Sequence, residues 1–117
     1  MSALDFLPPH LAALSISERE IVLSLDAALE AVDYLECHGR QILGWEGWVK
    51  TPDGRVGHGS APQGTVSLEE LSIAEAAAVC RATMPEDANS WAAENPTSPE
   101  SLFFCITVRG QSKCRNR

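Results

Sequence analysis

The apolar positions of the 117-residue chain fall into segments with two different periods. One helical repeat follows Ser24, which suits an N-cap, and stops before Gly39, which suits a left-handed helix end. The members of this repeat share one side of a helix: Leu25, Ala28, Leu29, Val32 and Leu35. The pattern predicts a helix over residues 25–38.

A second helical repeat begins after Ser72, with Glu75 placed to complete a capping box. Pro85 interrupts this repeat, and proline inside a helix removes a hydrogen bond and clashes with the preceding turn. We therefore expect one helix over residues 72–84 and another over residues 85–94. Thr83 and Glu86 are suitably spaced to cap the second of these helices.

Four segments have the composition of strands, at residues 19–24, 41–50, 54–58 and 101–109. The last is apolar on both faces, which indicates a central or covered strand. The first two, with the helix between them, suggest a right-handed crossover. The fold class predicted is α/β (α+β), a single domain with a small mixed sheet of about four strands and about three helices.

Strict alternation along residues 41–50 puts Leu43, Trp45, Gly47 and Val49 on one face, which we interpret as core. The opposite face would mix an indole with charged groups: Ile42, Gly44, Glu46, Trp48 and Lys50. Such a mixed face is typical of a recognition surface. Two alternatives stay open, because Trp48 could simply cover neighbouring structure, and the glycines allow a bulge that would turn one tryptophan around.

The two ends of the chain differ from the middle. Residues 1–18 contain Pro8 and Pro9 and predict an N-terminal arm, packed on the body through Phe6, Leu7 and Leu14. Residues 19–109 form the predicted domain, and residues 110–117 a flexible basic tail.

Charge narrows the choice of partner. The net charge is −7, and four of the nine basic residues lie within the last nine positions. Residues 1–108 therefore carry 16 acidic side chains against five basic ones, a balance of −11. A body of this charge repels phosphate backbones and attracts cationic surfaces, so we expect no direct nucleic-acid binding.

The cysteines and histidines give no sign of a metal site. The four cysteines include no Cys-x-x-Cys pair, and the three histidines lie outside zinc-ligand spacings. We expect reduced thiols, no metal and no cofactor. The first residues lack the features of a signal peptide, and no apolar run approaches the length of a membrane span. A cytoplasmic location without membrane contact is the simplest expectation.

Catalytic motifs are equally sparse in the sequence. Glu46 is the one carboxylate flanked by indoles, and only His58, across the predicted hairpin, could partner it in acid–base chemistry. We expect a protein without catalytic residues. The alternative is a small enzyme or ligand-binding domain with a pocket near Glu46, Trp48 and His58.

Two sets of residues are candidates for partner binding. The first lies on the predicted strand and consists of Trp45, Glu46 and Trp48. The second, Glu30, Asp33 and Glu36, lies on the polar side of the predicted helix over residues 25–38. For the second set a plain solvated helix face is the competing interpretation.

Part of the chain resembles a known family. Residues 19–109 are similar to the immunity protein 40 type of immunity proteins, found in bacterial polymorphic toxin systems. The resemblance rests on three segments: Glu20-Ile21-Val22-Leu23-Ser24, Ala27-Ala28-Leu29-Glu30-Ala31 and Ile42-Leu43-Gly44-Trp45-Glu46-Gly47-Trp48. It implies a non-enzymatic cytoplasmic protein that binds and blocks a cognate toxin effector domain. The oligomeric state and the toxin's activity do not follow from it.

Overall fold

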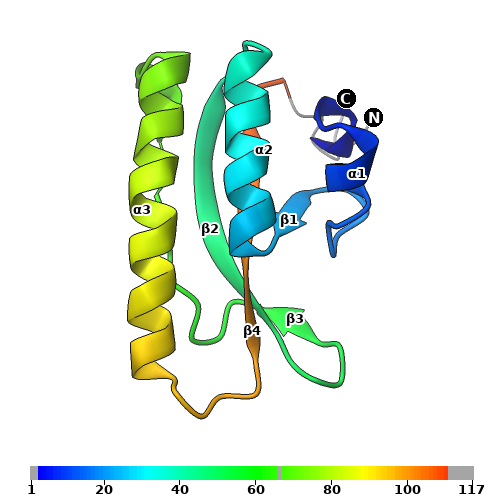
Figure 1. The fold of residues 1–117 in the computed structure, drawn as a ribbon, viewed down its shortest axis with the longest axis vertical. Coiled ribbons are helices and arrows are strands. Elements are labelled where there is room, and N and C mark those ends of the chain that lie inside the picture. Colours follow the sequence, from blue (N-terminus) through cyan, green and yellow to red (C-terminus); the bar gives the residue numbers. More distant parts are fainter. Residues whose placement is uncertain (1–2, 66, 111–117) are drawn as a thin grey trace.

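The computed structural model describes residues 3–65 and 67–110. A four-stranded sheet has the order β1-β4-β2-β3, and every neighbouring pair is antiparallel (Figure 1). The strands are β1 (Ile21–Leu23), β2 (Ile42–Lys50), β3 (Val56–Gly57) and β4 (Ser101–Val108). The helices are α1 (Pro9–Ala12), α2 (Leu25–Cys37) and α3 (Ile73–Glu94), with short 3₁₀ turns η1 (Ala3–Phe6) and η2 (Leu68–Glu70).

The predicted α+β class and the four strands are confirmed, although the sheet is antiparallel throughout rather than mixed. β1 and β2 are both antiparallel to β4, so they run in the same direction with β4 between them. The predicted connection from β1 through α2 to β2 therefore passes over β4, which lies between the two strands. The central place predicted for residues 101–109 is confirmed.

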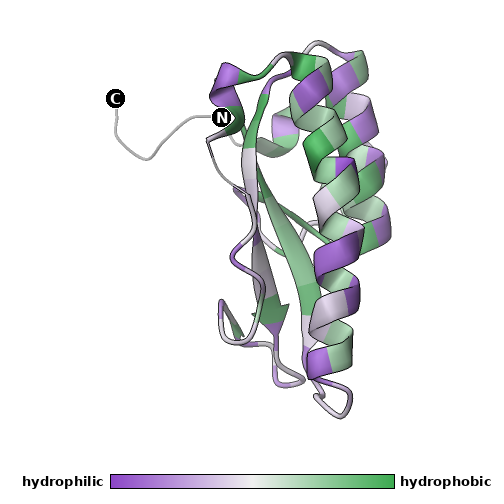
Figure 2. Cartoon of the chain, turned by 90° about the vertical axis from the view of Figure 1, so that its left-hand side faces the viewer, coloured by the Kyte–Doolittle hydropathy of each residue, from purple (hydrophilic) through white to green (hydrophobic). Residues whose placement is uncertain are grey.

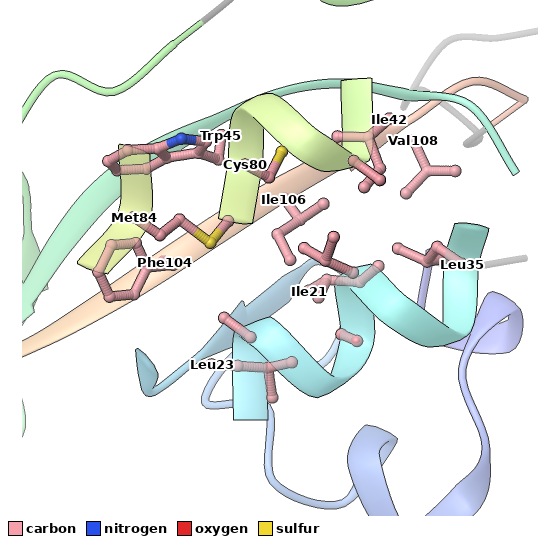
Figure 3. Close-up of a cluster of buried hydrophobic side chains, with 14 of the residues drawn as sticks. Ile21, Leu23, Leu35, Ile42, Trp45, Cys80, Met84, Phe104, Ile106 and Val108 are labelled. Atoms are coloured by element: carbon pink, nitrogen blue, oxygen red, sulfur yellow. The ribbon is translucent and has the colours of Figure 1, made fainter. Parts of the chain in front are cut away.

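Both long helices lie on the same side of the sheet, and the core fills the space between these layers (Figure 2). Trp45 and Phe104 meet there with their ring centroids 5.1 Å apart and their planes tilted by 59° (Figure 3). The Trp45 indole N–H donates to Thr83 Oγ1 at 2.9 Å. The largest side chain of the core thus has its only polar atom satisfied, which removes the penalty for burying it.

α3 begins as predicted but does not break at Pro85. The Ser72 hydroxyl accepts from the Glu75 amide, and the Glu75 carboxylate accepts from the Ser72 amide, both at 3.0 Å. The helix then continues through Pro85 to Glu94, so the two predicted helices are one. Thr83 caps nothing, because its hydroxyl donates to the Val79 carbonyl inside the helix at 2.8 Å.

The packing of α3 accounts for its continuity. A proline in a helix interior costs about 3 kcal/mol relative to alanine. α3 packs against both α2 and β2, and Met84, next to Pro85, is completely buried. Met84 alone contributes about 1.5–3 kcal/mol on burial, and Ala76, Ala77 and Cys80 of the same helix are buried as well, so their combined burial outweighs the local cost.

α2 has the predicted ends. Ser24 occupies the N-cap position with extended backbone, although its side chain makes no capping hydrogen bond. Gly39 has φ +70°, the left-handed conformation that allows the chain to turn toward β2.

The N-terminal arm belongs to the same core as the rest of the chain. Leu7 and Leu11 are buried, and Phe6 packs partly against the core beneath the Arg40 guanidinium, 4.5 Å from the ring centroid. The prediction that Leu14 anchors the arm is wrong, because this side chain is 57% exposed. Ile16 instead pairs its amide with the Val22 carbonyl at 3.0 Å and covers the outer edge of β1. Residues 111–117 of the predicted tail lie outside the described residues.

Candidate functional site

A bulge near the start of β2 decides which side chains reach each face of the sheet. Ile42 pairs with Val108 but Gly44 pairs with Thr107, so one extra residue is inserted between them. Ile42 consequently lies in the core, whereas Leu43 is only partly buried. The predicted facing is therefore wrong for these two residues.

From Gly44 onward the alternation is as predicted. Trp45 and Val49 are buried on the side of the helices, and Glu46 and Trp48 are half-buried on the other side. In the register with β4, Glu46 pairs with Cys105 and Trp48 with Phe103. We call the side of the sheet that faces away from α2 and α3 the open face (Figure 2). It carries Gly44, Glu46, Trp48, Phe103, Cys105 and Thr107.

Glu46 and Trp48 are joined on the open face. The Trp48 indole N–H donates to Glu46 Oε2 at 3.1 Å. The His58 ring meets the Trp48 ring edge-on at 5.8 Å, and His58 Nδ1 donates to the Gly47 carbonyl at 3.3 Å. The three side chains that the sequence grouped as a possible pocket are thus brought together by β2 and the segment that follows β3.

That segment, residues 58–65, lies against the outer edge of β2, and we call it the strap. Trp45 exchanges two backbone hydrogen bonds with Thr65, at 2.7 and 3.0 Å, and the Gly47 amide donates to the Pro62 carbonyl at 2.9 Å. Glycine is required at this contact. A Cβ atom on Gly47 would lie 2.5 Å from the Pro62 oxygen, and one on Gly64, where φ is +86°, would lie 2.1 Å from the Trp45 oxygen.

The strap is also tied to α3, through a tryptophan that the sequence left without a role. The Trp91 indole N–H donates to Ser60 Oγ at 2.9 Å. The strap therefore has contacts with both β2 and α3, and its position beside Glu46 is fixed from two directions.

Two hollows open beside Glu46, and it belongs to the lining of both. The larger has a volume of about 390 Å³ and is lined by Glu46, Gly47, His58, Gly59, Ala61, Pro62 and Gln63. The second has a volume of about 250 Å³ and is lined by Leu43, Gly44, Trp45, Glu46, Ser67, Glu69 and Thr107. Of the three residues of the predicted pocket, Glu46 and His58 line the larger hollow and Trp48 does not, although its ring meets the His58 ring edge-on.

A further carboxylate on the open face was missed by the sequence reasoning. Glu20 precedes Val22 by two positions, and Val22 pairs with Cys105. The Cys105 thiol donates to Glu20 Oε2 at 3.9 Å. The side-chain alternation of β1, continued backward two positions from Val22, would have placed Glu20 on this face. The predicted strand site contained residues of β2 alone.

Cys105 itself is not a nucleophile. Burial, and then the negative charges of Glu20 and Glu46, raise the pKa of its thiol to about 12. At neutral pH the thiol stays protonated, and the thiolate is the reactive form. The open face around it carries the aromatic rings of Trp48 and Phe103 and the two carboxylates of Glu20 and Glu46.

The acidic residues of the helix are already engaged within the chain. Arg81 on α3 bridges Asp33 Oδ1 and Glu36 Oε1, each at 2.7 Å, and the two hydrogen bonds raise the pKa of its guanidinium. Glu30 contacts His10 Nε2 at 2.7 Å. These carboxylates hold α2 to α3 and to the arm, so the helix set is a weaker candidate for partner binding than the sequence indicated.

Trp45 is excluded as a contact residue, because only 1% of it is exposed. Its side chain lies in the core, on the opposite side of β2 from Glu46 and Trp48. Of the strand set, Glu46 and Trp48 remain accessible candidates.

Comparisons with protein-family models, with curated proteins and with solved structures find no match. Within residues 3–65 and 67–110, no three His, Cys, Asp or Glu side chains are grouped to hold a metal ion. No helix in this part of the chain is long and apolar enough to cross a membrane.

Proposed function

We propose that the protein is a cytoplasmic immunity protein of a bacterial polymorphic toxin system, which binds a cognate toxin effector domain and blocks it. The observation that carries the proposal is the open face. Two half-buried aromatic side chains, Trp48 and Phe103, lie there beside two carboxylates, Glu20 and Glu46. Aromatic anchors surrounded by a polar rim are the usual components of a protein interface.

Charge supports a basic partner. The described residues carry all 16 acidic side chains but six of the nine basic ones. None of the ion pairs within residues 3–65 and 67–110 includes Glu20 or Glu46. A toxin that acts on nucleic acid presents a basic cleft, and an acidic surface complements it and speeds association. The resemblance of residues 19–109 to the immunity protein 40 type points to the same kind of partner.

The larger hollow favours a second candidate, a small ligand-binding domain or enzyme. Glu46 and His58 line it together, and this pair of groups is chemically able to exchange a proton. A small-molecule substrate would then fill the hollow without any protein partner.

The test is binding to the toxin domain encoded by the neighbouring gene. Calorimetry should show a 1:1 complex, and co-expression should restore growth of cells that produce the toxin. A protein that neither binds this domain nor protects the cells would refute the immunity role. Turnover or saturable binding of a metabolite without toxin binding would favour the second candidate.

A further inference from the structure

Glu46 holds an unusual position between the two hollows. Its Oε2 atom accepts from Trp48, and this is the one hydrogen bond of its carboxylate among the contacts of the described residues. The Oε1 atom therefore has no donor within the described chain. An ionised carboxylate with a free oxygen in a half-buried place gains energy from a new donor.

Glu46 is the only acidic residue in the lining of the larger hollow. The remaining lining groups are the His58 ring, the Gln63 amide, the apolar surfaces of Ala61 and Pro62, and the glycines of β2 and the strap. No lysine or arginine is among them. The hollow is thus negative on one side, with flat or apolar walls on the others.

We propose that this hollow receives an arginine side chain of the partner, with its guanidinium bonded to Glu46 Oε1. The inference rests on the proposed function, because it identifies which group of the toxin domain occupies this place on the open face. A guanidinium carries donors in one plane and stacks on rings, so it suits a carboxylate beside the His58 ring and the Pro62 surface. The Gln63 side-chain oxygen is available as a second acceptor.

Other occupants fit less well. An anion would meet the Glu46 charge and the acidic body around it. A metal ion would need several ligands, and the described residues contain no group of three that could supply them. A neutral donor could form a hydrogen bond with the Oε1 atom but would leave the negative charge of the carboxylate without an opposite charge.

The experiment uses small amides as probes of the whole protein, so it does not depend on the toxin. Argininamide is titrated into ¹⁵N-labelled protein. Citrullinamide, which keeps the α-ammonium group but has an uncharged side chain of nearly equal shape, and lysinamide, which has a cationic side chain without the planar guanidinium, are titrated in parallel. We expect saturable shifts of the Trp48 indole N–H and of the Gly59 amide with argininamide. The dissociation constant should be at least about tenfold larger for citrullinamide, because its side chain carries no charge to pair with the carboxylate.

Two variants locate the effect. Glu46→Gln removes the charge but keeps an oxygen that can accept from Trp48, so the fold is retained and argininamide binding should weaken at least about tenfold. Glu70→Gln makes the same change of charge at an exposed residue outside the hollow. Glu70→Gln should change the affinity for argininamide by less than about twofold, because an exposed charge outside the hollow contributes little to binding there.

Three results would overturn the inference: equal affinity for argininamide and citrullinamide, equal affinity for lysinamide, or unchanged binding by Glu46→Gln. Each would leave the immunity role standing if the wild-type protein still binds the toxin domain. If the wild-type protein fails to bind the toxin domain, the immunity role is refuted, whereas the binding of argininamide in the hollow is not.

Discussion

At the scale of single residues, Trp45 donates its indole N–H to Thr83 across the interface with α3, whereas Trp48 donates to Glu46 on its own strand. The first bond fixes a core side chain between sheet and helix. The second holds a carboxylate in place on the open face. Two tryptophans three positions apart thus stabilise the fold and shape the surface separately.

Removing a core ring should destabilise the protein strongly. Truncation of Trp45 or of Phe104 to alanine should each lower the free energy of unfolding by about 3–5 kcal/mol, because both rings are fully enclosed and a cavity would remain. Urea denaturation measures the loss. Val56→Ala, at a side chain that is 42% exposed, serves as the control and should cost less than about 0.5 kcal/mol. A loss below about 1 kcal/mol for Trp45→Ala would mean that the ring is not packed as described.

Trp48 should act through the lifetime of the complex. Trp48→Ala should raise the dissociation rate of the toxin complex, with a loss of about 2 kcal/mol in binding free energy, as for a typical aromatic anchor. Stopped-flow or surface-based kinetics with the toxin domain measures both rates. The variant must first give the circular dichroism spectrum of the native fold. An unchanged dissociation rate in a folded variant would place the interface away from the open face.

At the scale of elements, the features that depend on neighbours in sequence were predictable. The Ser72–Glu75 capping box, the helix end at Gly39 and the apolar repeat of α2 are local patterns, and each is present. Alternation placed Glu46 and Trp48 on one face because the side-chain period of a strand is fixed.

The features that depend on distant parts of the chain were not predictable. The continuity of α3 through Pro85 comes from packing on α2 and β2, which outweighs the local preference. The bulge between Ile42 and Gly44 is set by the register with β4. The ion pairs of Arg81 join α3 to Asp33 and Glu36 on α2. Glu20 joins the site only because β4 brings β1 and β2 into one sheet.

The strap offers a test at this scale. Gly64→Ala should detach it from β2, because the new methyl group would lie 2.1 Å from the Trp45 oxygen and the residue has φ +86°. Gly54→Ala is a matched control, with φ +94° but open space around the new atom. The control bears only the conformational cost of about 1–2 kcal/mol.

Hydrogen exchange distinguishes the two variants. The amides of Trp45 and Gly47 donate to the strap, so they should lose protection in Gly64→Ala and keep it in Gly54→Ala. Equal protection of these amides in both variants would show that the close approach of the strap is dispensable.

At the scale of the whole molecule, the acidic side chains outnumber the basic ones in the described chain, and the helix acids are partly neutralised by Arg81 and His10. The acidic side chains outside the ion pairs of the described residues include Glu20 and Glu46 on the open face, together with Asp26 on α2 and four residues of α3: Glu75, Glu86, Asp87 and Glu94. A negative balance of this size attracts a basic partner and speeds its approach to the molecule.

Salt should therefore control how fast the partner associates. The association rate of the toxin domain should fall steeply as ionic strength rises, since screening shortens the range of the field. Glu46→Gln should slow association most at low salt, and the matched variant Glu70→Gln should do so less. Kinetics at several salt concentrations provides the measurement. An association rate that does not depend on salt would contradict electrostatic steering.

The position of β4 has a consequence for how the protein is made. β1 and β2 form no hydrogen bonds with each other, because β4 lies between them. β4, residues 101–108, is synthesised after every other strand and helix of the described residues. The sheet cannot close on the ribosome until this last strand emerges. Until then the apolar sides of β1, α2 and β2 lack their central partner, and such exposed surface invites aggregation or chaperone binding. Under the proposed immunity role, protection of the cell would begin only once residues 101–108 have been synthesised and β4 has joined the sheet.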